Sequence, residues 1–253
     1  MPRQPTISSG AAMNPSPPPP QHTSLQLLGQ FRLELHGEPV PLCGDAQRLL
    51  AFVGLRRRVR RSVVAQTLWP DATGTHARGS LRTALWRLSG DGHEREFVHC
   101  TKESLALAQG VGVDAGTLAR TALDIVRGRG SLSADPLLTG LLDRGDLLPD
   151  WDDDWVVLER EWLRRLRLQA LDTLSERLAR HNMPALALEA AWASIRVEPL
   201  REDPHRAVVS AHLAEGNLIE ALRHYEAFRH LVRTELGAEP SVWFTRTIPP
   251  ELR

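Results

Sequence analysis

The residues with the clearest potential for chemistry are polar side chains on one predicted helix, residues 75–89. Advancing 100° per residue places Ala77, Ala84 and Leu88 on the same apolar stripe as Leu81. Donors, an aromatic ring and small residues occupy the other side: Thr75, His76, Gly79, Arg82, Thr83, Trp86 and Arg87. Guanidinium groups bind phosphates and the guanine edge, and threonine or an aromatic ring can contact a thymine methyl group. This side therefore has the chemistry of a nucleic-acid-binding surface.

Other basic residues extend this candidate site. Arg78 lies only about 60° from Leu81, so it would have to reach around the edge of the helix. The run "RRRVRR" just upstream supplies candidate phosphate ligands, although such runs are often only solvated surface. A charged helical face is likewise usually just solvated, so the elements around this helix must show whether the face binds DNA. The candidate DNA-binding residues are Arg58, Arg60, Arg61, Thr75, His76, Arg78, Arg82, Thr83, Trp86 and Arg87.

No known catalytic motif occurs in the sequence. GxxxxGK[ST], GxSxG and HExxH are all missing, and "HEREF" lacks the second histidine. The acidic run "DWDDDW" (150–155) could hold a hard metal ion. The better interpretation is that Asp152, Asp153 and Asp154 favour a helix N-terminus, where the dipole stabilises negative charge. We therefore expect no catalytic residue, no metal site and no cofactor.

Composition indicates a globular chain with an uneven charge distribution. The 253 residues are 42% apolar and 25% charged, and the formal net charge is zero. Residues 24–113 hold 12 basic and 8 acidic residues, whereas residues 114–240 hold 16 and 22. Two cysteines make neither a disulfide framework nor a metal knuckle. A basic front and an acidic back suggest two modules with different partners.

The elements around the candidate helix predict a winged helix-turn-helix. Alternating residues in 25–42 predict a small antiparallel sheet, and helical spacing follows in 44–56. A strand-like link (57–61) and a short helix (62–69), with Ser62 as its N-cap, lead through a turn to the helix 75–89. Two short alternating runs, "REFVHC" and "SLALAQ", then predict a β-hairpin. The last helix of such a unit lies in the DNA major groove.

The second half predicts a stack of helices. They cover 113–126, 155–181, 185–197, 203–216 with Asp203 as N-cap, and 217–237. "ALEAAW" (187–192) matches "ALRHYE" (221–226) at an offset of 34, the period of tetratricopeptide (TPR) helix pairs. Such stacks bind proteins or partner domains, or simply support a neighbouring domain. The fold class is thus mainly α with a small β component, a winged helix-turn-helix domain followed by an all-α TPR-like domain.

These patterns divide the chain into four parts. We expect a proline-rich disordered tail (1–24), a DNA-binding domain (25–110), a helical domain (113–240) and a C-terminal tail (241–253). The longest apolar run, "LLAFVGL", is too short to cross a bilayer, and no secretory signal is evident. We therefore expect no membrane contact and a cytoplasmic location, associated with the nucleoid.

Several segments resemble a known family. "LLGQFRLELHGEPVPL", "QRLLAFVGLR", "VVAQTLWPD" and "LRTALWRL" resemble the OmpR-type winged helix of the SARP-type antibiotic regulatory proteins. "LLPDWDDDWVVLERE", "EPLREDPHRA" and "AEGNLIEALRHYEAFRHLVRTELGAEPS" resemble their bacterial transcriptional activator domain (BTAD). In the wing, "FVHCTKESLAL" stands where that pattern leads us to expect an aromatic residue or Gly-Tyr, which leaves the wing's contact with DNA open.

The resemblance implies a function. A SARP-type protein would be a sequence-specific transcriptional activator, typically of secondary-metabolite genes, that binds direct repeats in promoter DNA and recruits RNA polymerase holoenzyme. A homodimer could form on the DNA. The loop 70–75 and the helical domain would face polymerase or a second copy. The alternative is a protein-interaction module whose winged helix and TPR-like domain bind a protein partner without DNA.

Overall fold

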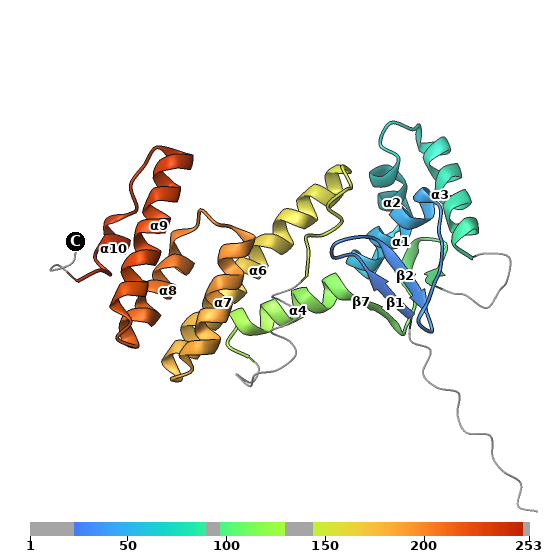
Figure 1. Ribbon diagram of the computed structural model, residues 1–253. Helices are drawn as coiled ribbons and strands as arrows, with labels where there is room; N and C mark the ends of the chain where they lie inside the picture. The colour runs from blue at the N-terminus through green and yellow to red at the C-terminus, as the bar shows by residue number, and fades with distance from the viewer. Residues whose placement is uncertain (1–22, 90–96, 130–143, 250–253) are drawn as a thin grey trace, which may run out of the picture.

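The computed structural model describes residues 23–89, 97–129 and 144–249, and its elements follow the predicted order. It is mainly α-helical, with two small sheets (Figure 1). The strands are β1 (Thr23–Gln26), β2 (Arg32–Leu35), β3 (Glu38–Pro39), β4 (Arg58–Arg60), β5 (Val98–Cys100), β6 (Ser104–Leu107) and β7 (Val111–Val113). The helices are α1 (Gly44–Arg56), α2 (Arg61–Leu68), α3 (Gly74–Ser89), α4 (Asp114–Val126), α6 (Asp154–Arg180), α7 (Pro184–Val197), α8 (Glu202–Ala214), α9 (Leu218–Leu236) and α10 (Val242–Thr245).

The first sheet has the strand order β3-β2-β1-β7. The antiparallel part, β1 to β3, is the sheet predicted from residues 25–42. Strand β7 pairs with β1 in parallel, a partnership between residues more than 80 positions apart that the sequence analysis did not predict. Val111 and Val113 are buried, so β7 adds apolar side chains to the core as well as backbone hydrogen bonds.

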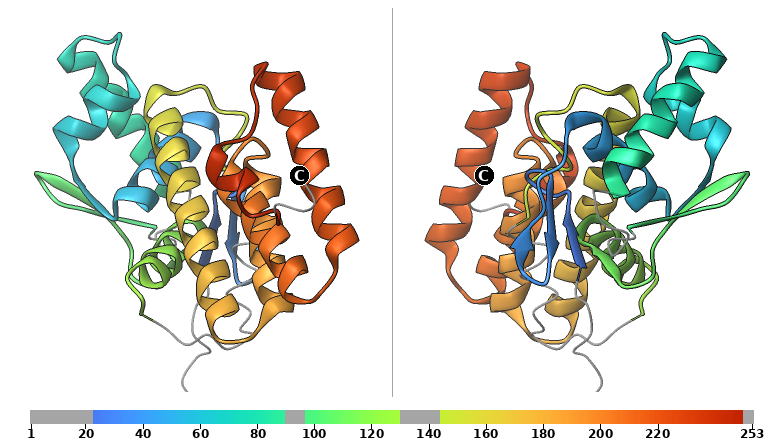
Figure 2. Two further views of the ribbon diagram at one scale, coloured as in Figure 1. Left: turned by 90° about the vertical axis from the view of Figure 1, so that its left-hand side faces the viewer. Right: turned by 90° about the vertical axis from the view of Figure 1, so that its right-hand side faces the viewer.

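The winged helix-turn-helix is confirmed. Helix α3 packs on α1 and α2 through the predicted stripe, in which Ala77, Leu81, Ala84 and Leu88 are all buried. The hairpin of β5 and β6 forms the wing, and β4 pairs with β6, so the second sheet has the order β4-β6-β5. Figure 2 shows α2, α3 and the hairpin projecting on the side of the molecule away from α9.

The helical half is a stack of antiparallel neighbours, α6 on α7, α7 on α8 and α8 on α9, which confirms the TPR-like prediction. The matching segments at offset 34 fall in α7 and α9, the second helix of each pair. Small apolar clusters lie between the pairs, such as Ala191, Ile195 and Val208 between α7 and α8. Gly237 is the C-cap residue of α9 and adopts the left-handed conformation, which glycine takes without steric cost.

Two local predictions were wrong. Helix α2 begins one residue earlier than expected, so Arg60 is the N-cap position and Ser62 lies inside the helix. Helix α8 begins at Glu202, with Arg201 at the N-cap position, because the first turn extends upstream of Asp203. A periodic pattern locates helix ends only to within one or two residues.

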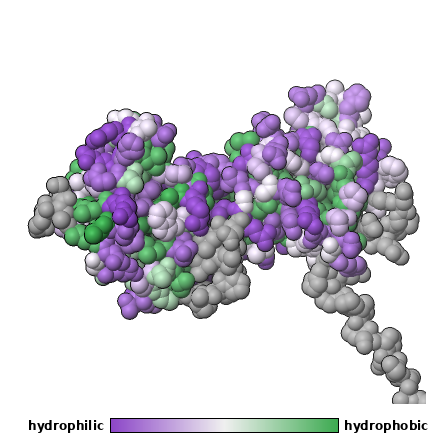
Figure 3. Space-filling model, in the orientation of Figure 1, coloured by the Kyte–Doolittle hydropathy of each residue, from purple (hydrophilic) through white to green (hydrophobic). Residues whose placement is uncertain are grey.

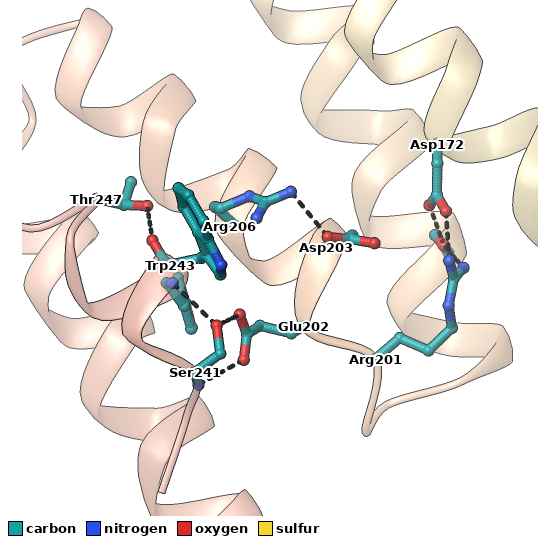
Figure 4. Close-up of polar contacts among 10 residues, drawn as sticks. Asp172, Arg201, Glu202, Asp203, Arg206, Ser241, Trp243 and Thr247 are labelled. Carbon is teal, nitrogen blue, oxygen red and sulfur yellow. Dashed lines mark hydrogen bonds and ion pairs between the residues drawn. The ribbon is translucent and has the colours of Figure 1, made fainter.

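Residues 241–249 are not a simple tail. Ser241 caps α10, and its hydroxyl also donates to the Glu202 carboxylate at the start of α8 (Figure 4). Phe244 and Ile248 are buried against α8 and α9. At the other end of the chain, Thr23 and Ser24 of the predicted tail belong to β1, and residues 1–22 lie outside the described residues.

The two halves share one hydrophobic core, because the N-terminal turns of α6 pack on α1. The Trp155 ring meets the Phe52 ring edge to face at 5.1 Å between centroids. Charged contacts flank this packing: Arg48 pairs with Asp153, and Arg56 pairs with Glu159. A single cluster of buried side chains therefore runs from the first sheet through α1 and α4 into α6 and α7.

Asp114 ties the sheet to the helical half. Its carboxylate accepts the backbone N–H groups of Leu27 at 2.8 Å and Leu28 at 3.1 Å, just beyond β1. It also accepts the N–H of Ala115 in the first turn of α4. One carboxylate thus satisfies donors from a strand end and a helix N-terminus, which holds α4 against the sheet.

A histidine pair lies where α8 meets α9, with His205 buried and His224 partly buried. The Nε2–H of His205 donates to the Pro199 carbonyl at 2.9 Å, so its Nδ1 accepts from Nε2 of His224 at 3.0 Å. Burial, together with the nearby His205 and His212, lowers the pKa of His224 to about 4. Burial also lowers the pKa of His205, although its hydrogen bond to Pro199 opposes that shift. Both rings are therefore neutral in the folded protein near pH 7.

Trp155→Ala should strongly destabilise the protein, because it removes a buried ring from the contact between α1 and α6. We expect the free energy of unfolding to fall by about 3–5 kcal/mol. Trp162→Ala is the matched control: Trp162 is 50% exposed on the same helix, so its loss should have little effect. Urea denaturation followed by circular dichroism measures both, and similar losses for the two variants would contradict the proposed packing.

The histidine pair predicts a loss of stability in mild acid. The unfolded chain has an ordinary histidine pKa near 6.5 and therefore binds more protons than the folded protein between pH 6.5 and about 4. The free energy of unfolding should fall as the pH drops through this window, by at most about 1.4 kcal/mol per pH unit for each proton. His224→Gln should reduce this slope, whereas His230→Gln, at an exposed position on α9, should not. Equal slopes in both variants, from denaturation at stepped pH, would exclude the pair as the cause.

Candidate nucleic-acid interface

The polar face of α3 is exposed along the length of the helix. The buried stripe fixes which way the helix faces, so Thr75, Arg78, Arg82, Thr83 and Trp86 all lie on the solvent side. Trp86 is 71% exposed, an unusual position for a large aromatic side chain. An indole packed on a neighbouring element would be far more buried, so Trp86 is available to a ligand.

Two of these residues are partly held by local hydrogen bonds. Nδ1 of His76 lies 2.9 Å from the Thr73 hydroxyl, in the turn that leads into α3. The Thr83 hydroxyl donates to the Gly79 carbonyl one turn earlier. Both contacts are solvent-exposed and orient the side chains at little cost, so neither residue is prevented from meeting a ligand.

Arg78 and Arg82 have no ion-pair partner within residues 23–89, 97–129 and 144–249. They come from successive turns of α3, four residues apart, and lie on the same side of the helix as Trp86. An added Cβ at Gly79, between them, would meet nothing within 4 Å, so the surface there is open. Two uncompensated guanidinium groups beside an exposed indole can meet phosphates and base edges.

Arg87 differs from the other arginines of α3. Its guanidinium lies 3.7 Å from the Asp45 carboxylate and 3.8 Å from Sγ of Cys43, at the start of α1. Part of its charge is therefore already compensated within the protein. Arg87 lies at the edge of the candidate face, and the contact helps to hold α3 against α1.

The strand β4 and the wing together line a basic hollow of about 460 Å³. Its lining consists of Arg58, Arg60, Thr101, Lys102, Glu103 and Ser104. Sequence reasoning missed Lys102, although the only lysine of the chain, placed in a predicted hairpin turn, was an available signal. Arg61 starts α2 and is partly buried, and its backbone N–H donates to the Glu103 carbonyl.

The basic candidate face is not covered by the acidic half. Helix α3 lies at the opposite end of the molecule from α9 and α10 (Figure 1). Hydrophilic residues dominate the side of both halves seen in Figure 3. A duplex could therefore approach α3 and the wing without displacing any described helix.

The helical half has a separate groove of about 550 Å³ between α6, α7 and α8. Its lining includes several alanines, Pro184 and Pro204, and charged residues, of which Asp203 pairs with Arg206 and Asp172 pairs with Arg201 outside the lining (Figure 4). Glu176, Arg180 and Glu215 also line the groove, so these two pairs do not balance all of its charges.

The acidic run 150–155 serves the fold. Asp153 is the N-cap position of α6 and pairs with Arg48, and Asp154 lies in the first turn. The described part of the chain contains no group of three or more His, Cys, Asp or Glu arranged to hold a metal ion. Nor does any helix in that part combine the length and apolar character needed to span a membrane.

Comparison with known proteins agrees with this architecture. The family model of the bacterial transcriptional activator domain matches residues 101–248, which confirms that part of the resemblance. The solved structure of Mycobacterium tuberculosis EmbR in complex with a low-affinity phosphopeptide has a similar fold, with a TM-score of 0.66 at 19% identity. That match covers 90% of this chain but only 64% of EmbR. No curated protein matches the chain significantly.

Proposed function

The chain belongs to the bacterial transcriptional activator domain family, and on that premise we propose that it is a sequence-specific, DNA-binding transcriptional activator. Members of this family regulate transcription. In our proposal the protein binds direct repeats in promoter DNA and recruits RNA polymerase holoenzyme, and its targets are secondary-metabolite genes. It acts in the cytoplasm at the nucleoid. A homodimer on the repeats is part of the same proposal.

The uncompensated face of α3 is the observation that carries this proposal. In a winged helix the second helix of the helix-turn-helix enters the major groove. Arg82 and Trp86, with Thr83 and Thr75 at the sides, would then face base edges. Arg78 would contact the backbone near the start of α3, His76 would lie beside it, and Arg87 would contact a phosphate from the edge of the face.

The hollow beneath the wing supports a second contact with the backbone. Arg58 and Arg60 alternate along β4 on the same side as Lys102 of the hairpin turn, so three cations surround one space. A single Glu103 offsets them. Phosphates bound here would anchor the protein on the duplex without reading sequence. Arg61 contributes less to this contact, because it is half buried at the start of α2.

We also propose that the domain division follows function, with residues 25–110 binding DNA and residues 113–240 meeting proteins. The alternative function is a protein-interaction module that binds no DNA. The groove between α6, α7 and α8 favours a protein-binding role for the helical half but does not distinguish the two hypotheses. Footprinting on the promoters beside the gene, with and without polymerase, would identify the operator.

Arg82→Ala should weaken binding to the footprinted promoter fragment, because Arg82 lies at the centre of the exposed face of α3. The loss of one charged contact to a base or a phosphate costs about 1–3 kcal/mol, a roughly 5- to 150-fold rise in Kd. The control is Arg223→Ala, an exposed arginine of α9 paired with Glu220 at the far end of the molecule. Fluorescence anisotropy measures both, and an unchanged Kd for Arg82→Ala would remove that residue from the interface.

The salt dependence of binding should report the phosphate contacts of the hollow. Neutralised phosphates release counterions, so log Kd rises with log salt concentration in proportion to their number. Arg58→Ala and Lys102→Ala should each lower that slope by about 1 and weaken binding to all sequences alike. If the wild-type protein has no DNA affinity even at low salt, the interaction-module alternative is correct instead.

A further inference from the structure

The groove between α6, α7 and α8 has the size of a small-molecule site. Its volume of about 550 Å³ lies within the range of roughly 300–1,000 Å³ that such sites occupy in proteins. Helices α6 and α8 form its walls, and α7 contributes Ala187 and Ala191, which are buried and therefore lie at its base. Stacked helix pairs leave a concave surface of this kind, and here it is deep enough to admit a ligand.

Small side chains keep this space open. Helix α6 presents Ala179 to the groove, and α8 presents Ala207 and Ala211, where longer side chains would fill the gap. The buried Ser175 also lines the groove, but its hydroxyl donates to the Ala187 carbonyl at 2.9 Å and is therefore already satisfied. The base and much of the walls thus offer apolar surface to the apolar part of a ligand.

Ion pairs neutralise part of the charge that lines the groove. At the end where α8 begins, the Asp203 carboxylate lies 2.8 Å from the Arg206 guanidinium (Figure 4). Asp172 of α6 lies 2.6 Å from the guanidinium of Arg201, which is outside the lining. The charged residues of the lining that remain are Glu176, Arg180 and Glu215.

These three residues leave the groove with an excess of negative charge. None of them makes an ion pair with any residue that the structure describes. Nε of Arg180 donates to the backbone carbonyl of Glu176 at 3.4 Å, and the Glu215 carboxylate accepts from the Asn217 amide at 3.2 Å. Two carboxylates therefore stand against one guanidinium, so one positive charge on a ligand would balance the lining. Glu176 occupies the turn of α6 between Asp172 and Arg180, midway along that wall.

We propose that the groove binds a small organic cation, a molecule with an apolar body and one ammonium group. The apolar body packs on the alanines of the base and the walls, and the ammonium group donates to the Glu176 carboxylate. The volume of the groove and the excess charge of its lining favour this class over an anion or a neutral molecule. The site goes beyond the proposed function, since occupying it requires neither DNA nor polymerase.

The test uses three probes that share one apolar ring and differ in charge: 1-naphthylmethylamine, 1-naphthylmethanol and 1-naphthylacetate. Ligand-observed NMR measures the Kd of each for the full chain at pH 7, without DNA. The amine carries a positive charge at this pH, so it should bind about 2- to 5-fold more tightly than the alcohol, which is the gain expected from an exposed ion pair. The acetate should bind most weakly of the three.

Two variants, each with a matched control, locate the binding. Glu176→Gln should remove the preference for the amine, whereas Glu235→Gln, at an exposed acid of α9, makes the same change in net charge and should not. Ala179→Phe should abolish binding of all three probes because its ring fills the groove, whereas Ala227→Phe, on the exposed side of α9, should leave binding intact. All four positions are exposed, so the circular dichroism spectra should match that of the wild type.

Three outcomes would overturn the proposal. If none of the probes binds the wild type, as expected of a groove that holds a segment of a partner protein instead, the groove is not a small-molecule site. If Ala179→Phe leaves probe binding unchanged, the probes bind elsewhere. If the amine and the acetate bind equally well, or if the preference for the amine survives Glu176→Gln, the assigned charge is wrong. Because no measurement uses DNA, a wild type that fails to bind DNA would contradict the proposed function alone.

Discussion

The packing of α6 on α4, together with the contact of its first turns with α1, holds the winged helix and the helical half in one arrangement. Phe52 and Trp155 meet in a buried, edge-to-face pair, and the ion pair Arg48–Asp153 closes the contact at its rim. Because α1 is also a wall of the winged helix, apolar burial on both of its sides joins two modules into one core. An interface of this kind resists the relative motion that short linkers between domains usually allow.

This rigidity gives the exposed face of α3 a defined direction. The helix has a thin apolar stripe, and once Leu81 and Leu88 are buried against α1 and α2, every other side must face solvent. The packing of the helix, and not ion pairs with carboxylates, sets the direction of the arginines on that side. Arg87 is the exception, since Asp45 holds it back toward α1. The same packing that stabilises the domain therefore also presents its basic groups.

Patterns local in sequence predicted most of this fold. Apolar spacing located α1, α3, α6 and α9 to within a residue or two, because each of these helices buries one regular stripe. Contacts between distant segments escaped prediction: the parallel pairing of β7 with β1, the Arg48–Asp153 pair and the burial of Phe244. No periodicity encodes which distant partner a strand or an aspartate meets. The same limit applies to the candidate site, where Lys102 joins Arg58 and Arg60 only after the wing folds beside β4.

The structure also explains part of the uneven charge distribution along the chain. Several acids of the second half serve as structural ligands: Asp153 for Arg48, Glu159 for Arg56 and Asp114 for backbone donors beyond β1. These carboxylates neutralise Arg48 and Arg56, the arginines of α1 that face the helical half, whereas Arg78 and Arg82 at the other end of the winged helix have no ion-pair partner among the described residues. Electrostatic attraction to a polyanion would thus be directed to one end of the molecule. The acidic half need not repel DNA, because some of its carboxylates form the ion pairs that join the two modules.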